Sequence, residues 1–157
     1  MYKAAVRALL RSSIRRLNEG DLSMLLKLAH RDFELAFPGD NSWATMFRPT
    51  ERGRQRFVTH RGIREGTAFG KQFVDEGVQF EIEDILVNGP PWNLRVALRV
   101  HDFVPSADGG PDEYNNRAVA FLEIRWGKLM SWEDYEDTER VAAWDRSRRA
   151  IDTVPTG

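Results

Sequence analysis

Alternation of apolar and polar residues over four successive segments constrains this chain more than any other feature. Strands are predicted at 78–87, 92–104, 114–126 and 129–135, with their apolar residues on the even-numbered side. Because the side chains of a strand point alternately to its two faces, one face of the predicted sheet is apolar and the other is charged. The links between these strands are short, so the four strands are expected to form an antiparallel sheet.

Three short polar residues interrupt the apolar even-numbered side: Asp102, Asn116 and Asp134. A carboxylate on an apolar face is costly to bury unless it is paired, hydrogen-bonded or protonated. These positions are therefore the strongest indication of chemistry in the sequence. The odd-numbered side, which carries Arg99 and His101, is expected to be a solvated face or a contact between subunits.

Helices are predicted before and after the four strands, where apolar residues recur at steps of three and four. These further elements are helices at 3–18, 22–29, 61–75 and 138–149, with one short strand at 33–37. Asp137 is expected to cap the last helix. Helices followed by a run of hairpins predict an α+β fold, in which the helices pack on one face of a curved antiparallel sheet. A single domain over 1–157 is expected, with a core at about 3–150 and a tail at 151–157.

Residues 38–58 show no convincing periodicity, and so long a stretch without regular structure is unusual inside a compact domain. The segment contains Trp43, which could close over a cavity. It is therefore predicted to be either a lid or an arm that contacts another subunit. His60, just before the third helix, could face the same cavity or could serve as a surface or capping residue.

Charge and composition exclude several classes of function. Lys and Arg (23) nearly balance Asp and Glu (24), and a net charge of −1 gives no electrostatic case for nucleic-acid binding. No apolar run approaches the length of a membrane span. The chain has no cysteine, which fits a cytoplasmic protein, and its three histidines lack the spacing of metal ligands. No metal and no other cofactor is expected.

Two short motifs carry a family resemblance: Phe37-Pro38-Gly39-Asp40 after the first strand, and the segment from Trp132 to Thr138 that follows Gly127-Lys128-Leu129. With the order of the elements, they make the chain similar to the SnoaL-like branch of the nuclear transport factor 2-like superfamily. That superfamily includes polyketide cyclases, ketosteroid isomerases, limonene epoxide hydrolases, dehydratases and proteins without catalysis. The resemblance implies a cone of helices and bent sheet with a hydrophobic pocket at its open end, and a homodimer.

The resemblance also bears on single residues. Asp134 falls where the polyketide cyclases place their acid/base aspartate, and it matches an aspartate of hydrolases that resemble the limonene enzyme. Those hydrolases need an arginine and a second aspartate two positions apart on a neighbouring strand, whereas the same-face pair here is Val100 and Asp102. The cyclases use a histidine near the start of the penultimate strand, where this chain has Tyr114-Asn115-Asn116-Arg117.

These observations predict a site for a small hydrophobic molecule. Asp134 is expected to be the acid/base and Asp102 its partner, because two neighbouring buried carboxyls push each other's pKa values apart. Asn116 and Tyr114 would hold a carbonyl or enolate oxygen. The other residues expected in the binding site are Trp43, His60, Trp92, Met130 and Trp132.

The favoured hypothesis is an enzyme that carries out isomerisation, cyclisation or dehydration by proton transfer. A non-catalytic ligand-binding or dimeric assembly module of the same fold is the first alternative, and an epoxide hydrolase is the second. Roles without chemistry also stay open for both acids. Asp102 could face water at a strand end, and Asp134 could be a structural carboxylate that accepts a bond from a tryptophan indole.

Overall fold

A bent sheet with helices on one face makes up most of the molecule. The computed structural model describes residues 1–39, 48–52 and 55–152, with side chains given for 1–39 and 61–148. The helices are α1 (Tyr2–Asn18), α2 (Ser23–Leu28), α3 (Gly62–Asp75) and α4 (Thr138–Asp152). The strands are β1 (Ala29–Pro38), β2 (Arg48–Arg52), β3 (Gln55–Arg61), β4 (Gln79–Asn88), β5 (Asn93–Val104), β6 (Tyr114–Arg125) and β7 (Lys128–Glu136).

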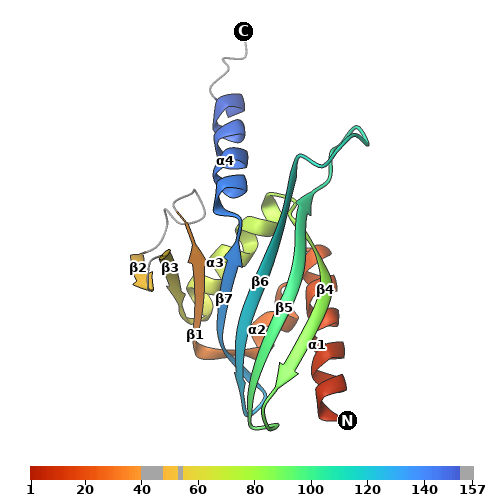
Figure 1. The fold of residues 1–157 in the computed structure, drawn as a ribbon, viewed down its shortest axis with the longest axis vertical. Coiled ribbons are helices and arrows are strands. Elements are labelled where there is room, and N and C mark those ends of the chain that lie inside the picture. Colours follow the sequence, from red (N-terminus) through yellow and green to blue (C-terminus); the bar gives the residue numbers. More distant parts are fainter. Residues whose placement is uncertain (40–47, 53–54, 153–157) are drawn as a thin grey trace.

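The strands form one sheet in the order β2-β3-β1-β7-β6-β5-β4 (Figure 1). Strands β4 to β7 pair antiparallel through short links, as the sequence predicts. Strand β1 pairs with β7 in parallel, so the sheet is mixed and not wholly antiparallel. This pairing joins segments that are far apart in the chain, and the local pattern of neither strand indicates it.

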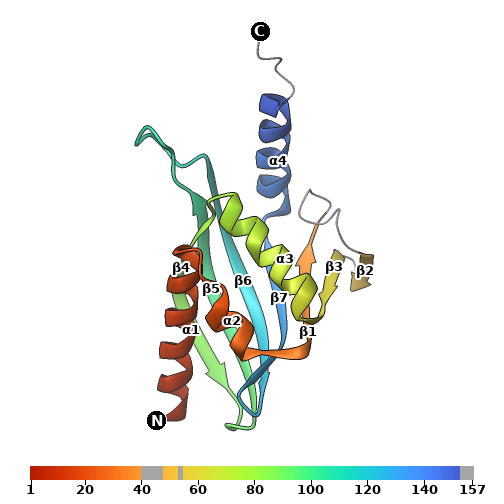
Figure 2. The ribbon, with the colours of Figure 1, turned by 180° about the vertical axis from the view of Figure 1, so that it is seen from behind.

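The helices α1, α2 and α3 cover one face of the sheet, and α4 continues from β7 beyond the sheet's end (Figure 2). Helix α1 turns Leu10 and Ile14 toward the sheet, where they are 2% and 5% exposed. The α+β fold with a curved sheet against N-terminal helices and a final C-terminal helix is thereby confirmed. In the part of the chain that the structure describes, no helix is long and apolar enough to cross a membrane.

The even-numbered residues of β5 and β6 face the helices and form the core, as predicted. Leu98 is fully buried, and Val96 and Leu122 keep 1% and 2% of their surface. Burying an aliphatic side chain of this size stabilises the fold by roughly 1.5–3 kcal/mol. The odd-numbered residues of the same strands, such as Arg95 and Arg99, lie on the opposite face and form ion pairs there.

Two β-bulges reverse this alternation, so the expectation of an even-numbered apolar side is wrong in parts of β4 and β7. In β4 the register shifts between Ile82 and Asp84, and beyond it Ile85 is buried while Leu86 is 62% exposed. In β7 the register shifts so that Leu129 is buried and Met130 is the additional residue. A bulge inserts one unpaired residue into a strand, which moves all later side chains to the other face.

The segment 38–58 contains regular structure that its sequence pattern did not indicate. Strands β2 and β3 pair antiparallel, and β3 in turn pairs with β1. Strand β2 lies at the edge of the sheet, and its sequence, Arg-Pro-Thr-Glu-Arg, has the charges and the proline typical of edge strands. The choice between a lid and an arm depends on residues 40–47, including Trp43, which lie outside the described residues.

Candidate functional site

A cavity of about 130 Å³ lies between the sheet and the helices α1, α2 and α3. Its described lining is apolar apart from three acids, Asp102, Asp134 and Glu136, and Trp132. An apolar cavity of about 150 Å³ is known to hold a benzene molecule. The space therefore suits a molecule with roughly one ring.

Two glycines of α3, Gly66 and Gly70, belong to the lining and lie one helical turn apart. Glycine inside a helix costs roughly 0.5–1 kcal/mol relative to alanine, so the pair lowers the stability of α3. A Cβ atom at Gly70 would come within 2.8 Å of the Leu22 side chain, and one at Gly66 would lie 3.5 Å from the Phe33 ring. The two glycines therefore let α2 and β1 approach α3 and keep this wall of the cavity thin.

Asp102 lies near the end of β5 with 5% of its surface exposed, so it does not face water. Its Oδ2 atom accepts a hydrogen bond of 2.9 Å from the Tyr114 hydroxyl. Its Oδ1 atom is buried without a hydrogen-bond partner among the described residues. Burial raises the pKa of Asp102, although the Tyr114 hydrogen bond opposes that rise.

Tyr114 and Asn116 lie behind Asp102 and are absent from the described cavity lining. The Asn116 amide donates 3.0 Å bonds to the Tyr114 hydroxyl and to the backbone carbonyl of Asp137, which occupies both of its N–H groups. The Tyr114 ring packs against Trp144 of α4, with ring centroids 5.0 Å apart. The Tyr114 hydroxyl thus donates to Asp102, and the Asn116 amide donates to Tyr114 and Asp137, so the donors of both residues have partners within the protein.

Asp134 lies on β7 and borders the same cavity. Its Oδ1 atom accepts a 2.7 Å hydrogen bond from the indole N–H of Trp132, which also lines the cavity. Burial raises the pKa of Asp134 to about 7; the charge of Asp102 adds to the rise, and the indole bond opposes it. Asp134 therefore accepts a bond from a tryptophan indole, as expected of a structural carboxylate, and also borders the cavity, as expected of a site residue.

Glu136 is a third cavity carboxyl, and the sequence analysis missed it. It is the last residue of β7, and its Oε1 atom is buried without a partner in the described part of the chain. Burial raises its pKa well above the usual value, and the charges of Asp102 and Asp134 raise it further, with a smaller contribution from Asp137. Extending the alternation of Trp132 and Asp134 by two residues would have found it, but the strand was predicted to end at 135.

The strand register places these acids on the inner face of neighbouring parts of the sheet. In the sheet, β6 lies between β5 and β7, with Ala118 opposite Glu136 and Ala120 opposite Asp134. On β5 these two alanines lie opposite Val100 and Leu98, and Asp102 lies opposite Asn116, so Asp102 is diagonal to the acids of β7. The charge of Asp102 raises the pKa of Asp134, and the charges of Asp102 and Asp134 raise the pKa of Glu136, so the three acids lie close enough to interact.

Other residues expected in the site lie elsewhere. Trp92 is 53% exposed beside Trp126, at a ring distance of 6.5 Å, because it precedes the first residue of β5 and does not follow the strand's alternation. Met130 occupies the β7 bulge and is not among the lining residues. The backbone of His60 pairs with Leu35, and its side chain lies outside the described residues.

The outer face of the sheet holds the charged residues that the sequence placed there. Arg99 and Arg117 both reach Glu83, at 2.9 and 3.0 Å. His101 stacks on Phe103 and lies 3.7 Å from Glu81. The arginine that the epoxide hydrolases require is therefore absent from the described lining, since these arginines face away from the cavity.

A metal site needs several ligand side chains that converge on one point. Among residues whose side chains are described, no group of three or more His, Cys, Asp or Glu could hold a metal ion. The carboxyls of Asp102, Asp134 and Glu136 therefore border a common space without forming a metal-binding set.

Solved structures with the same architecture place the fold among nuclear transport factor 2-like proteins. One of them is a nuclear transport factor 2-like protein of unknown function from Burkholderia pseudomallei. It matches with a TM-score of 0.63 and 17% sequence identity, over 87% of this chain and 95% of that protein's chain. A candidate polyketide cyclase from Xanthomonas campestris matches with a TM-score of 0.56 and 17% identity over 88% and 94% of the two chains. A nuclear transport factor 2-like protein from Burkholderia xenovorans matches with a TM-score of 0.58 and 19% identity over 88% and 93%.

A family model narrows the assignment. The model of the SnoaL-like domain matches residues 10–132, which is most of the chain. The chain belongs to the SnoaL-like domain family. A comparison with curated protein sequences gave no match.

Proposed function

We propose that this protein is an enzyme that transfers protons on a small hydrophobic molecule, in an isomerisation, cyclisation or dehydration that uses no cofactor. One observation carries the proposal: three interacting carboxyls border an otherwise apolar cavity that suits a molecule of about one ring. Proton transfer needs a group that both gives and takes a proton near the working pH. Carboxyls reach that range only where burial and like charge raise their pKa values.

Asp134 is the acid/base in this proposal. Its pKa of about 7 gives both protonation states at neutral pH, and the Trp132 indole fixes one oxygen so that Oδ2 is left for the transferred proton. Asp102 is the partner whose charge adds to the rise in the Asp134 pKa. Tyr114 and Asn116 are positioning residues, which hold the Asp102 carboxyl by hydrogen bonds without touching the ligand.

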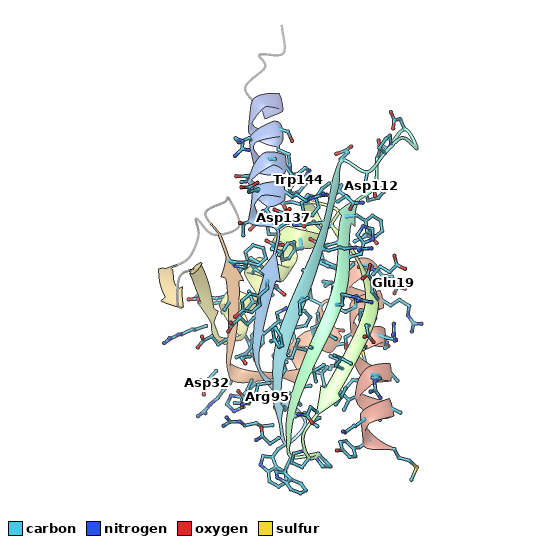
Figure 3. The ribbon with its side chains drawn as sticks, in the orientation of Figure 1. Glu19, Asp32, Arg95, Asp112, Asp137 and Trp144 are labelled. Atoms are coloured by element: carbon cyan, nitrogen blue, oxygen red, sulfur yellow. The ribbon has the colours of Figure 1, made fainter. Side chains whose placement is uncertain are left out.

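Exchange of substrate protons with solvent tests this proposal without knowledge of the natural substrate. One-ring ketones and hydroxyketones would be incubated with the protein in D₂O, and deuterium at carbon would be measured by mass spectrometry. We expect incorporation by the native protein and none above background with Asp134→Asn. The matched control is Asp112→Asn, which makes the same change at the exposed tip of the β5–β6 hairpin (Figure 3).

The outcome separates the enzyme from the binding module. If Asp134→Asn exchanges protons as fast as the native protein, Asp134 is not the acid/base. If the probes bind but no variant, including the native protein, promotes exchange, the non-catalytic ligand-binding hypothesis takes the place of the enzyme.

A homodimer through the outer face of the sheet is a second part of the proposal. Leu86, Phe121 and Tyr135 are 62%, 53% and 39% exposed there, and the rings of Phe121 and Tyr135 meet edge to face at 5.8 Å. Exposed apolar side chains of this size favour a protein contact. A monomeric mass in solution at micromolar concentration would refute the dimer. The cytoplasmic location stays a prediction from the absence of cysteine.

A further inference from the structure

When its acids are ionised, the described lining of the cavity accepts hydrogen bonds and offers almost none. Asp102, Asp134 and Glu136 supply its side-chain oxygens, and no lysine, arginine, histidine, amide or hydroxyl residue accompanies them in that lining. The one N–H group, on the Trp132 indole, already donates to Asp134. A ligand that fits this chemistry must bring its own donors.

Two of the acceptor atoms are buried and have no hydrogen-bond partner among the described residues. They are Asp102 Oδ1 and Glu136 Oε1, and Asp102 has only 5% of its surface exposed. Buried polar atoms in folded proteins are nearly always paired, and an unpaired one calls for an explanation such as a missing ligand group. Both atoms belong to residues that border the cavity, so a bound ligand with more than one N–H donor is a candidate to satisfy them.

We propose that the cavity binds an apolar molecule that carries a protonated amine, whose N–H groups donate to Asp102 Oδ1 and Glu136 Oε1. This inference rests on the proposed function, because it takes the same cavity as the binding site. An ammonium group has three donors and no acceptor, so it matches a site that contains only acceptors. A ketone binds only when one of these acids is protonated and donates to it, and a carboxylate would bring a further negative charge beside the three acids.

The remaining geometry agrees with a cation on an apolar body. The ring of the ligand would lie against the apolar lining, to which Phe33 of β1 and Phe69 of α3 belong. The positive charge would replace the repulsion between the carboxyls by attraction to each of them. Asp134, whose second oxygen is not needed for this contact, would be left to transfer a proton.

Three probes of nearly equal size and shape test the inference: benzylamine, benzyl alcohol and benzoate. They carry a positive, a neutral and a negative group on the same ring, and binding to the native protein would be measured by titration calorimetry at pH 7. We expect benzylamine to bind at least about tenfold more tightly than benzyl alcohol, since hydrogen bonds to a charged donor are roughly twice as strong as neutral ones. Benzoate should show no binding.

Matched variants locate the charge. Glu136→Gln and Asp102→Asn should each remove most of the preference for benzylamine over benzyl alcohol. Glu133→Gln makes the same change as Glu136→Gln on the same strand, at a residue outside the described lining, and should keep the preference. A preference that survives in both cavity variants would overturn the inference.

The probes also separate this inference from the proposed function. If benzyl alcohol binds as tightly as benzylamine, the amine inference is wrong and the cavity still takes small hydrophobic molecules. If none of the three probes binds the native protein, the inference and the hydrophobic ligand site both fall. Because the native protein alone gives these outcomes, a variant that fails to fold does not prevent the test.

Discussion

Acids lie on both faces of the sheet, but the residues around them differ. On the outer face, Glu123 meets Arg95 at 2.7 Å and also contacts Arg125. Partial burial alone would raise the pKa of Glu123, but the hydrogen bonds and charges of these arginines outweigh it and lower the pKa. On the inner face, Asp134 and Glu136 have no such partner among the described lining residues, and their pKa values rise.

The comparison teaches that the neighbours of a carboxyl decide its protonation. Acids on both faces come from the same hairpins, and only the alternation of the strands separates them. Acids with a lowered pKa and acids with a raised pKa can therefore lie in one hairpin, as Glu123 of β6 and Asp134 of β7 do. Substitutions on the inner and outer faces should therefore have different effects on stability.

The largest effect is expected from the pH dependence of stability. The pKa of Asp134 is about 7 in the folded chain, against an ordinary value of 3.8, so between these pH values the folded state holds a proton that the unfolded state has lost. The free energy of unfolding should therefore fall as pH rises from about 4 to 7, and Asp134→Asn should lessen that fall. At about 1.4 kcal/mol per pKa unit, we expect the variant to gain about 2–4 kcal/mol relative to the native protein on going from pH 4 to pH 8. Urea unfolding at a series of pH values measures this, and parallel curves for the two proteins would contradict it.

Loss of the hydroxyl that supports Asp102 should have the next largest effect. Tyr114→Phe keeps the ring against Trp144 but leaves Asp102 Oδ2 without its donor. A buried acceptor without a partner costs about 1–3 kcal/mol, and the pKa of Asp102 should rise further. Urea unfolding at pH 8 gives the stability change, and infrared titration of the carboxyls gives the pKa change. Tyr135→Phe on the outer face is the matched control, and an equal loss there would show that the effect is not specific to the inner face.

Filling the wall of the cavity should separate stability from binding. Gly66→Ala removes the cost of a glycine inside α3, and its new Cβ atom lies 3.5 Å from the Phe33 ring, which is ordinary contact. We expect a gain of up to about 1 kcal/mol in stability together with weaker binding of one-ring probes. At Gly70 the new atom would lie 2.8 Å from Leu22, so Gly70→Ala should gain less. Thermal unfolding and titration calorimetry check both changes, and tighter probe binding by Gly66→Ala would contradict this account of the wall.

The smallest effect is expected from an ion pair of the outer face. Because the pKa of Glu123 is lowered in the folded state, Glu123 stabilises the protein above its ordinary pKa and loses that contribution as pH falls. Glu123→Gln should therefore cost at most about 1 kcal/mol at neutral pH, less at high salt, and nothing near pH 3. This is the opposite sign to Asp134→Asn. The same sign for both variants in urea unfolding would remove the distinction between the two faces.

The sequence predicted most of the fold because strand alternation and helix periodicity are local properties. The inward-facing positions of Asp102 and Asp134, both in the cavity lining, followed from the alternation alone. Long-range pairing did not follow, since the local sequence of β1 and β7 does not indicate that the two strands pair. The hairpin of β2 and β3 was not predicted either, because the charged residues and the proline of the edge strand β2 give no alternation of apolar and polar residues.

The candidate site was predicted less completely, for reasons that lie in single residues. Glu136 was missed because the strand continues one residue beyond its predicted end. Met130 was misplaced because a bulge is not visible in the alternation before it occurs. Tyr114 and Asn116 were placed on the correct face, but only the structure shows that Tyr114 donates to Asp102 and that Asn116 donates to Tyr114.

The cap of α4 joins the C-terminal helix to the acids of the cavity. Asp137 accepts N–H bonds from the first turn of α4 at 3.1 and 3.3 Å, and its carbonyl takes one of the Asn116 amide protons. The series of bonds then runs through Tyr114 to Asp102. A displacement of α4 would therefore disturb the bonds that support the Asp102 carboxyl and change its pKa, although α4 contributes no residue to the described cavity lining.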